Sequence, residues 1–183
     1  MHFPTIEPLG TQRLTIREIT AADLPDLQAV NGDPEVTRFL PYATWKSEED
    51  AQAWLARMQA LAESGTGRQF VITLNGTDKV IGTILLFRFD AGSARAELGY
   101  VLGRAHWGQG LMEEALRAFC GHLFMTAGLR RLEAEVDPAN EASNALLARL
   151  GFVREGRLRE RWVSKGGDAY DTNIYGALAE EWR

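Results

Sequence analysis

The stretch with the clearest chemical potential is Gly108-Gln109-Gly110, which places two glycines one residue apart at the predicted start of a helix. Glycine has no side chain, so the backbone at these positions is able to approach a ligand closely. The first N–H groups of a helix lack partners within the helix and carry partial positive charge. Together these features predict an anion site, and phosphate is its usual occupant, although an ordinary strand-to-helix turn also contains glycine.

Two common phosphate-binding motifs do not fit this stretch. A Walker loop ends in Gly-Lys followed by Ser or Thr, whereas Gly110 is followed by Leu111 and Met112. A dinucleotide-binding fingerprint needs a third glycine, and Glu113 stands at the position where that glycine would fall. Neither nucleotide-binding class is therefore expected.

The elements that must position the glycine stretch are a strand before it and a helix after it. Residues 96–102 form an apolar run typical of a strand, and residues 111–126 have the amphipathic pattern of a long helix. A further strand is predicted over 131–136, where apolar residues alternate with Arg131, Glu133 and Glu135. One face of that strand is therefore polar and, in a sheet covered by helices, is expected to line a cleft.

The remaining pattern predicts a mixed α/β fold with one central, mostly antiparallel sheet flanked by helices. Strands are expected over 13–19, 69–74, 79–89, 152–162 and 170–176, with a hairpin turn at 75–78. Helices are expected to begin at Thr20, at Asp33-Pro34 and at Ser47, and another to run from Glu141 to Leu150 before Gly151.

Composition limits the possible classes of protein. The 183 residues are 45% hydrophobic and 25% charged, which suits one globular domain over residues 1–183. The net charge of −5 does not suggest a nucleic-acid partner, and no apolar run is long enough to cross a membrane. The single cysteine, Cys120, excludes an internal disulfide and is expected to pack in the core. We therefore expect a cytoplasmic protein, and no metal site is predicted.

The glycine stretch resembles the pyrophosphate loop of the GNAT superfamily of acetyl-CoA-dependent N-acetyltransferases. That loop has the pattern Gln/Arg-x-x-Gly-x-Gly/Ala, of which Gly108 and Gly110 match and Ala105 departs. The RimJ/RimL-like branch of ribosomal-protein N-terminal acetyltransferases is more similar. Its features here are His106, Trp107, Glu114 and Ala115, together with Thr11-x-Arg13-Leu14, Gly151-Phe152 and Asp171-Thr172. The resemblance extends over about residues 11–178 and implies a GNAT-like fold.

The resemblance implies an enzyme that transfers acetyl from acetyl-CoA to a primary amine by direct attack in a ternary complex. The acceptor it implies is a protein N-terminal α-amine, with a small-molecule amine as the alternative. A non-catalytic acyl-CoA-binding or sensing module on the same fold is a further alternative. No metal, membrane or nucleic-acid partner is expected, and the protein is expected to be a monomer or a homodimer.

The resemblance also suggests catalytic roles. The backbone N–H of Leu102 corresponds to the family's donor for the developing oxyanion. Glu135 matches a general base proposed in one branch of the family, and Glu97 matches one used in another branch. A chain of waters without a single base is the third possibility. Leu147 replaces the tyrosine that many relatives use to protonate the leaving thiolate, and Ser143 is the substitute unless it only begins a helix.

Candidate acetyl-CoA-binding residues follow from the same correspondence. Asn140 is expected either to hydrogen-bond the pantetheine arm or to order the bend before the helix. The full candidate set is Tyr100, Leu102, Trp107, Gly108, Gln109, Gly110, Leu111, Met112, Asn140, Ser143 and Asn144.

Overall fold

A computed structural model describes residues 3–182, and its strands form one sheet in the order β1-β2-β3-β4-β5-β6-β8-β7. The strands are β1 (Leu9–Gly10), β2 (Leu14–Glu18), β3 (Arg68–Leu74), β4 (Val80–Asp90), β5 (Arg95–Leu102), β6 (Arg131–Val136), β7 (Val153–Val163) and β8 (Ala169–Leu178). Within these residues only β5 and β6 pair in parallel, and every other neighbouring pair is antiparallel. The predicted mixed sheet is confirmed.

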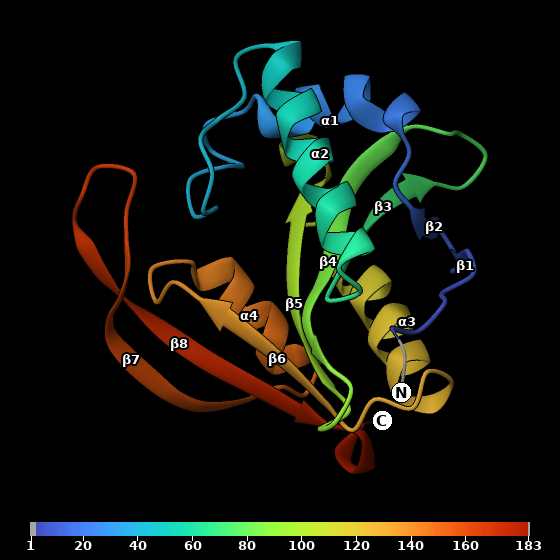
Figure 1. Ribbon diagram of the computed structural model, residues 1–183, viewed down its shortest axis with the longest axis vertical. Coiled ribbons are helices and arrows are strands. Elements are labelled where there is room, and N and C mark those ends of the chain that lie inside the picture. Colours follow the sequence, from blue (N-terminus) through green and yellow to red (C-terminus); the bar gives the residue numbers. More distant parts are fainter. Residues whose placement is uncertain (1–2, 183) are drawn as a thin grey trace.

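Helices cover both faces of the sheet (Figure 1). On one face lie α1 (Leu24–Asn31) and α2 (Glu48–Glu63), and on the other lie α3 (Leu111–Met125) and α4 (Glu141–Arg149). Short 3-10 turns are formed by Ala21–Asp23, Arg104–His106 and Ala179–Glu181. The predicted helix starts at Thr20 and Ser47 and the glycine end of α4 at Gly151 are confirmed.

The sheet separates two hydrophobic cores, one on each of its faces. The larger core joins α3 and α4 to the sheet and contains Phe119, Cys120 and Leu147, all fully buried. The smaller core lies under α1 and α2 and contains Trp45 and Trp54. Alternation along β6 sends its apolar side chains into the larger core, so its polar residues face the α1–α2 side.

The parallel strands β5 and β6 diverge soon after they meet. Their pairing extends only from Arg95 opposite Arg131 to Glu97 opposite Glu133. Beyond this point the strands separate, as Figure 1 shows, and α3 follows the end of β5 while α4 follows the end of β6. Beyond Glu97 and Glu133 the facing edges of β5 and β6 are not hydrogen-bonded to each other, and we call the interval between these edges the gap.

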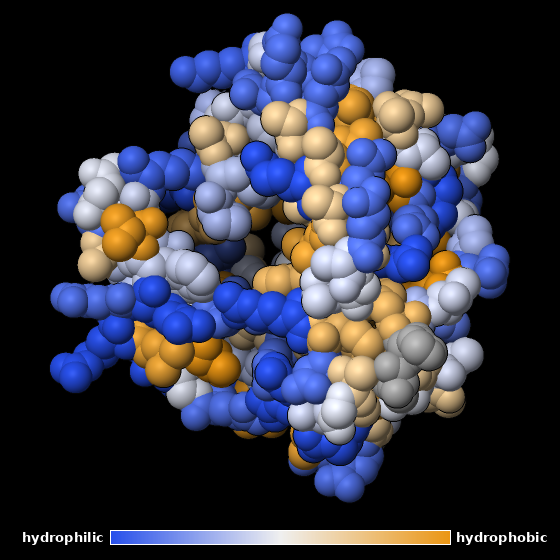
Figure 2. All heavy atoms as spheres, in the orientation of Figure 1, coloured by the Kyte–Doolittle hydropathy of each residue, from blue (hydrophilic) through white to orange (hydrophobic). Residues whose placement is uncertain are grey.

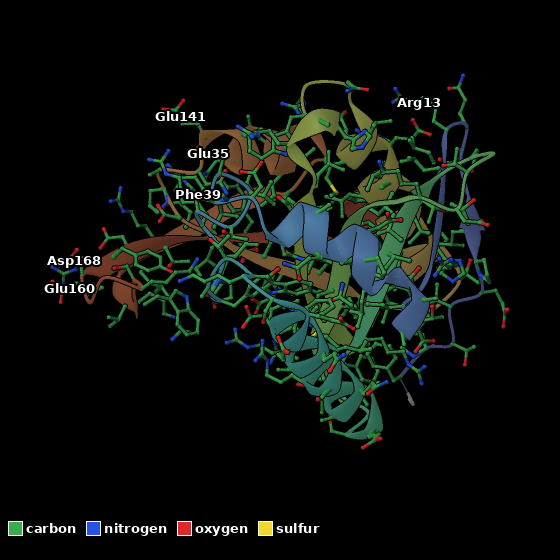
Figure 3. The ribbon with its side chains drawn as sticks, turned by 90° about the horizontal axis from the view of Figure 1, so that it is seen from above. Arg13, Glu35, Phe39, Glu141, Glu160 and Asp168 are labelled. Atoms are coloured by element: carbon green, nitrogen blue, oxygen red, sulfur yellow. The ribbon has the colours of Figure 1, made fainter. Side chains whose placement is uncertain are left out.

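A long hairpin, β7–β8, extends from the sheet beyond β6. Its outer strand β7 is exposed along its whole length, and Figure 3 shows Glu160 and Asp168 at its outer end. The tip reaches back to the connection between α1 and α2, where Lys165 Nζ donates to the carbonyl of Thr37 at 2.9 Å. The hairpin and the α1–α2 connection therefore meet on the face that the polar side of β6 occupies.

The prediction of a helix that begins at Asp33 is wrong. Residues 33–42 form successive turns instead. Asp33 Oδ1 accepts the N–H of Glu35, and the N–H of Leu40 bonds to the carbonyl of Thr37, so a continuous ladder of helical hydrogen bonds does not develop. Among the described residues, no helix combines the length and apolar character needed to cross a membrane.

Candidate active site

The glycine loop lies between the turn Arg104–His106 and α3. Gly108 has φ 69° and Gly110 has φ 72°, both in the left-handed region that favours glycine. A Cβ at Gly108 would meet no atom of the described residues within 4 Å, so the backbone conformation, and not crowding, requires glycine there. Gly110 is the N-cap of α3, and no described side chain caps this helix. The first N–H groups of α3 are therefore left available to an anion.

The backbone of Leu102 is oriented toward the gap between β5 and β6. Gly103 N donates to the carbonyl of Ile81 at 2.8 Å, and Leu102 lies opposite Gly82. Because hydrogen bonding alternates along an antiparallel pair, the N–H and C=O of Leu102 point away from β4. The carbonyl accepts Trp107 Nε1 at 2.7 Å, which ties the loop to the end of β5.

Ser143 lies in the first turn of α4 and meets Tyr100 from β5. Asn140 caps the helix, and its Oδ1 accepts the N–H of Ser143 at 3.2 Å. The hydroxyls of Ser143 and Tyr100 are 2.6 Å apart. Burial raises the pKa of Tyr100, so its phenol stays protonated and able to donate. The capping oxygen of Asn140 thus orders the bend, while the hydroxyl of Ser143 is not used as a cap.

Both polar atoms of the Asn144 side chain are hydrogen-bonded within the protein. Its Nδ2 donates to the carbonyls of Asp137 at 3.0 Å and Asn140 at 2.7 Å. Its Oδ1 accepts from Asn173 Nδ2 and from Tyr175 OH, each at 2.8 Å. Asn144 therefore joins α4 to β8 and to the preceding turn.

The opposite face of the sheet carries the two candidate bases, and Arg88 of β4 joins them. Arg88 Nη1 lies 2.6 Å from Glu97 Oε2 and 3.2 Å from Glu135 Oε1. Both carboxylates are largely buried, with side-chain exposures of 8% for Glu97 and 15% for Glu135. Residues that the sequence offered as alternatives are therefore parts of one cluster, which we call the Arg88 cluster (Arg88, Glu97, Glu135, Arg161 and Trp162).

The pKa values of the two carboxyl groups are shifted in opposite directions. Burial raises the pKa of Glu97, and the nearby Arg88 offsets this only in part. Burial also acts on Glu135, but hydrogen bonds from Trp162 and Arg161 and the charge of Arg88 outweigh it, so the pKa of Glu135 is lowered. Glu97 is therefore the better proton acceptor, and Glu135 is held as a carboxylate.

Two residues of β7 supply the remaining contacts of the Arg88 cluster. Trp162 Nε1 donates to Glu135 Oε2 at 2.7 Å, and Arg161 Nη2 lies 3.3 Å from Glu135 Oε1. The guanidinium carbons of Arg161 and Arg88 lie 5.2 Å and 6.0 Å from the centre of the Trp162 ring. Figure 2 shows this face hollowed between the hairpin and the α1–α2 side, with both hydrophilic and hydrophobic residues around the hollow. In the described part of the chain, no group of three or more His, Cys, Asp or Glu residues is placed to hold a metal ion.

Sequence reasoning missed the partners of the carboxylates. Arg88 follows an apolar strand pattern and has φ 51°, at a register shift between Phe87 and Asp90 that the sequence does not reveal. Trp162 ends a predicted strand, and it contacts Glu135 beyond a register shift between Leu158 and Trp162 that the sequence does not reveal. The one available signal was the basic character of β7, which alternates with acidic residues.

The arrangement places two different chemistries on opposite sides of one gap. The anion-binding loop and the Tyr100–Ser143 hydroxyl pair belong to the α3–α4 side. The Arg88 cluster belongs to the other side. A long, thin ligand along the unpaired edge of β5 would be reached by the N–H of Leu102, and Glu97 lies five residues earlier on the same strand, on the opposite face of the sheet.

A family model, similar sequences and similar structures all point to acetyltransferases. Residues 13–153 match the family described as "Acetyltransferase (GNAT) domain". An uncharacterized N-acetyltransferase, p20, of Bacillus licheniformis is 35% identical over 177 residues, which are 97% of this chain and 99% of that protein. The ribosomal-protein-serine acetyltransferase of Escherichia coli is 32% identical over 136 residues, 74% of each chain. The fold matches that of RimL, a ribosomal L7/L12 α-N-protein acetyltransferase solved with coenzyme A, with a TM-score of 0.84, 22% identity, and coverage of 94% of this chain and 98% of that one.

Proposed function

Because the chain belongs to the GNAT family of acetyltransferases, we propose that it transfers the acetyl group of acetyl-CoA to a protein N-terminal α-amine by direct attack in a ternary complex. The observation that carries the proposal is the placement of the buried carboxyl of Glu97, whose pKa is raised, on the opposite face of the sheet from the open start of α3. One side suits a diphosphate, and the other suits an amine that must lose a proton.

Acetyl-CoA fits the glycine loop. Its diphosphate would accept hydrogen bonds from the backbone between Trp107 and Met112, where the left-handed glycines turn the chain and the first turn of α3 has free N–H groups. The pantetheine arm would then enter the gap between β5 and β6, past Tyr100 and Asn140.

The N–H of Leu102 is the donor for the charge that develops on the thioester carbonyl oxygen. Its direction, away from β4 and into the gap, is the direction such a donor needs. Glu97 lies five residues before Leu102 on the regular strand β5, about 16 Å along the chain, so it takes the proton of the attacking amine through a chain of waters, and Glu135 stays ionised beside it. A base with a raised pKa is matched more closely to neutral pH than one whose pKa is lowered.

Ser143 hydrogen-bonds the sulfur as the thiolate leaves. The Tyr100 phenol is the more acidic hydroxyl in solution and the better donor, so it donates to Ser143 and leaves the serine hydrogen free to point at the sulfur. Leu147, fully buried in the core, contributes no hydroxyl at the position where many relatives have tyrosine.

An α-amine suits this site because it is easily deprotonated. With a pKa of about 8, roughly a tenth of an N-terminal amine is neutral at pH 7, against about one lysine in a few thousand. The serine-directed ribosomal-protein acetyltransferase among the relatives supports the same acceptor class. The cytoplasmic location and the monomeric or homodimeric state stay predictions of the sequence.

The experiment is thiol release from acetyl-CoA with three sets of acceptors. They are peptides beginning with serine, the same peptides with a blocked α-amine, and small primary amines. We expect sustained release with the free peptides and background release with the blocked ones. Release with small amines alone would replace the proposed acceptor with a small-molecule one. Tight acetyl-CoA binding without release for any amine would identify a non-catalytic binding module.

A further inference from the structure

The segment just before β2 is hydrogen-bonded to the carboxylate of Glu114, at the start of α3 about 100 residues later. Glu114 Oε1 accepts from Thr11 Oγ1 at 2.6 Å and from the N–H of Arg13 at 2.8 Å. Glu114 Oε2 accepts from Arg13 Nε at 2.6 Å. Both oxygens of a carboxylate in the first turn of α3 are therefore engaged by the N-terminal segment.

Arg13 also reaches the glycine loop itself. Its Nη1 donates to the carbonyl of Gln109 at 3.0 Å. Its Nη2 lies 3.7 Å from the position that a Cβ on Gly110 would take, and no hydrogen-bond partner for Nη2 occurs among the described residues. Figure 3 shows Arg13 away from the hairpin end that carries Glu160 and Asp168, so this contact is separate from the Arg88 cluster.

These contacts resolve an electrostatic conflict. A carboxylate in the first turn of α3 favours the helix but repels an anion bound at the same end. Burial raises the pKa of Glu114, but hydrogen bonds from Thr11 and Arg13 outweigh it and keep the group ionised. The guanidinium of Arg13 compensates that charge at 2.6 Å, and its side chain remains 44% exposed beside the loop. The loop thus keeps a net attraction for a diphosphate.

The conformation of the glycine loop also needs support from contacts with residues outside the loop. Its two glycines have left-handed backbone conformations, and no described side chain caps α3 at Gly110. Glycine gives up more conformational freedom on ordering than any other residue, so an unsupported Gly-x-Gly loop would sample other conformations. The bond from Arg13 to the Gln109 carbonyl lies between the two glycines, where it restricts both.

We propose that Arg13 and Glu114 are positioning residues that hold the glycine loop in its anion-binding conformation and compensate its charge for the diphosphate of acetyl-CoA. The inference rests on the proposed function for its ligand. It assigns a role in donor binding to the N-terminal Thr11-x-Arg13 segment, which lies far from the loop in sequence.

The test compares two thioester donors, acetyl-CoA and S-acetyl-pantetheine, which has the same reactive arm without the diphosphate and nucleotide. The variants are Arg13→Ala, Arg13→Lys and Glu114→Gln. The matched control is Glu113→Gln, on the neighbouring residue of the same helix, whose carboxylate pairs with Arg117 and Arg149 and not with the loop.

We expect Arg13→Ala to raise the KM for acetyl-CoA about tenfold or more, as for the loss of charge-assisted hydrogen bonds, with kcat nearly unchanged. Arg13→Lys should recover part of this loss, because lysine restores the charge but not the forked geometry. Glu114→Gln should fall between them, and Glu113→Gln should match the wild type. With S-acetyl-pantetheine all four variants should have the kcat/KM of the wild type.

Equal losses with both donors would overturn the proposal, because they would show a general effect on the fold. An unchanged KM for acetyl-CoA in every variant would overturn it as well. If Arg13→Ala does not fold, Arg13→Lys and Glu114→Gln carry the test. Calorimetry with CoA alone separates this proposal from the proposed function, because it measures loop binding even in a protein that acetylates no amine.

Discussion

The glycine loop and the Arg88 cluster lie on opposite faces of the sheet and are built in different ways. The loop uses backbone groups from a single stretch, Trp107 to Met112, and its conformation depends on two glycines. The Arg88 cluster uses side chains from β4, β5, β6 and β7, which come together only when the sheet and its hairpin are formed. The backbone conformation of the loop is therefore determined locally, although Arg13 holds the loop from about 100 residues away, whereas every contact of the Arg88 cluster depends on the tertiary fold.

The largest expected effect comes from Glu97→Gln, which removes the proposed proton acceptor. We expect kcat to fall by about 10²–10⁴-fold, the usual contribution of a general base, with the KM for acetyl-CoA nearly unchanged. Initial-rate kinetics with a serine peptide measures both constants. Glu133→Gln is the control, since Glu133 lies on the same polar face but pairs with Arg95 and Arg131. Wild-type turnover by Glu97→Gln would exclude Glu97 and leave Glu135 or a chain of waters as the proton acceptor.

The next largest effect is on the donor side. Gly110→Val places a β-branched residue at φ 72°, which costs at least about 1–2 kcal/mol and presents a side chain where the diphosphate would approach. We expect acetyl-CoA affinity, measured by calorimetry, to fall by at least about tenfold.

The control for this substitution is Gly76→Val, at φ 77° in the β3–β4 turn, which carries the same backbone strain away from the loop. Its affinity should equal that of the wild type. If Gly110→Val folds and binds acetyl-CoA normally, the glycine loop is not the diphosphate site.

Ser143→Ala separates chemistry from helix capping. Because Asn140 is the cap of α4, loss of the Ser143 hydroxyl should leave the helix start intact. We expect turnover to fall about tenfold, below the usual range for a proton donor, since a thiolate leaves readily. Acetyl-CoA affinity should be nearly unchanged, because the thiolate charge exists only late in the reaction.

Two melting experiments accompany that substitution. Asn140→Ala should lower the thermal midpoint by the equivalent of about 1 kcal/mol, the usual value of a cap. A midpoint loss of that size in Ser143→Ala with wild-type turnover would assign Ser143 a structural role.

The glycine loop could be predicted from sequence because its determinants are neighbours. Gly108 and Gly110 report their backbone conformation directly, and the strand and helix around them have clear periodicity. The polar face of β6 was predictable for the same reason. Both carboxylates, Glu97 and Glu135, were identified as alternatives, but their joint contact with one arginine was not.

The remaining features depend on geometry that has no local signature. The position of Arg88 follows a register shift late in β4, and that of Trp162 follows a register shift in β7 after Leu158. The turns after Asp33 were mistaken for a helix because proline after aspartate also begins turns. Glu114 and Arg13 belong to motifs visible in the sequence, but about 100 residues separate them and nothing local pairs them.

The smallest expected effect is a pH dependence of stability with opposite signs at the two carboxylates. The folded pKa of Glu97 lies above its ordinary value of 4.5, so the folded state binds more protons and the wild type loses stability as pH rises through that window. The folded pKa of Glu135 is lowered, so its stabilisation is present above 4.5 and is lost as pH falls through the folded pKa.

Thermal midpoints measured between acidic and neutral pH test these signs. Relative to the wild type, Glu97→Gln should gain stability as pH rises, and Glu135→Gln should lose it, by about 2–4 °C for each kcal/mol. Parallel slopes for the two variants would show that the carboxylates have the same environment.

Initial-rate kinetics with both substrates varied, on the wild type, Gly110→Val and Glu97→Gln, tests the division between the two sides most directly. We expect Gly110→Val to raise the KM for acetyl-CoA while kcat stays near the wild-type value, and Glu97→Gln to lower kcat while that KM stays near the wild-type value. Changes of both constants together in both variants would contradict separate donor and acceptor sides.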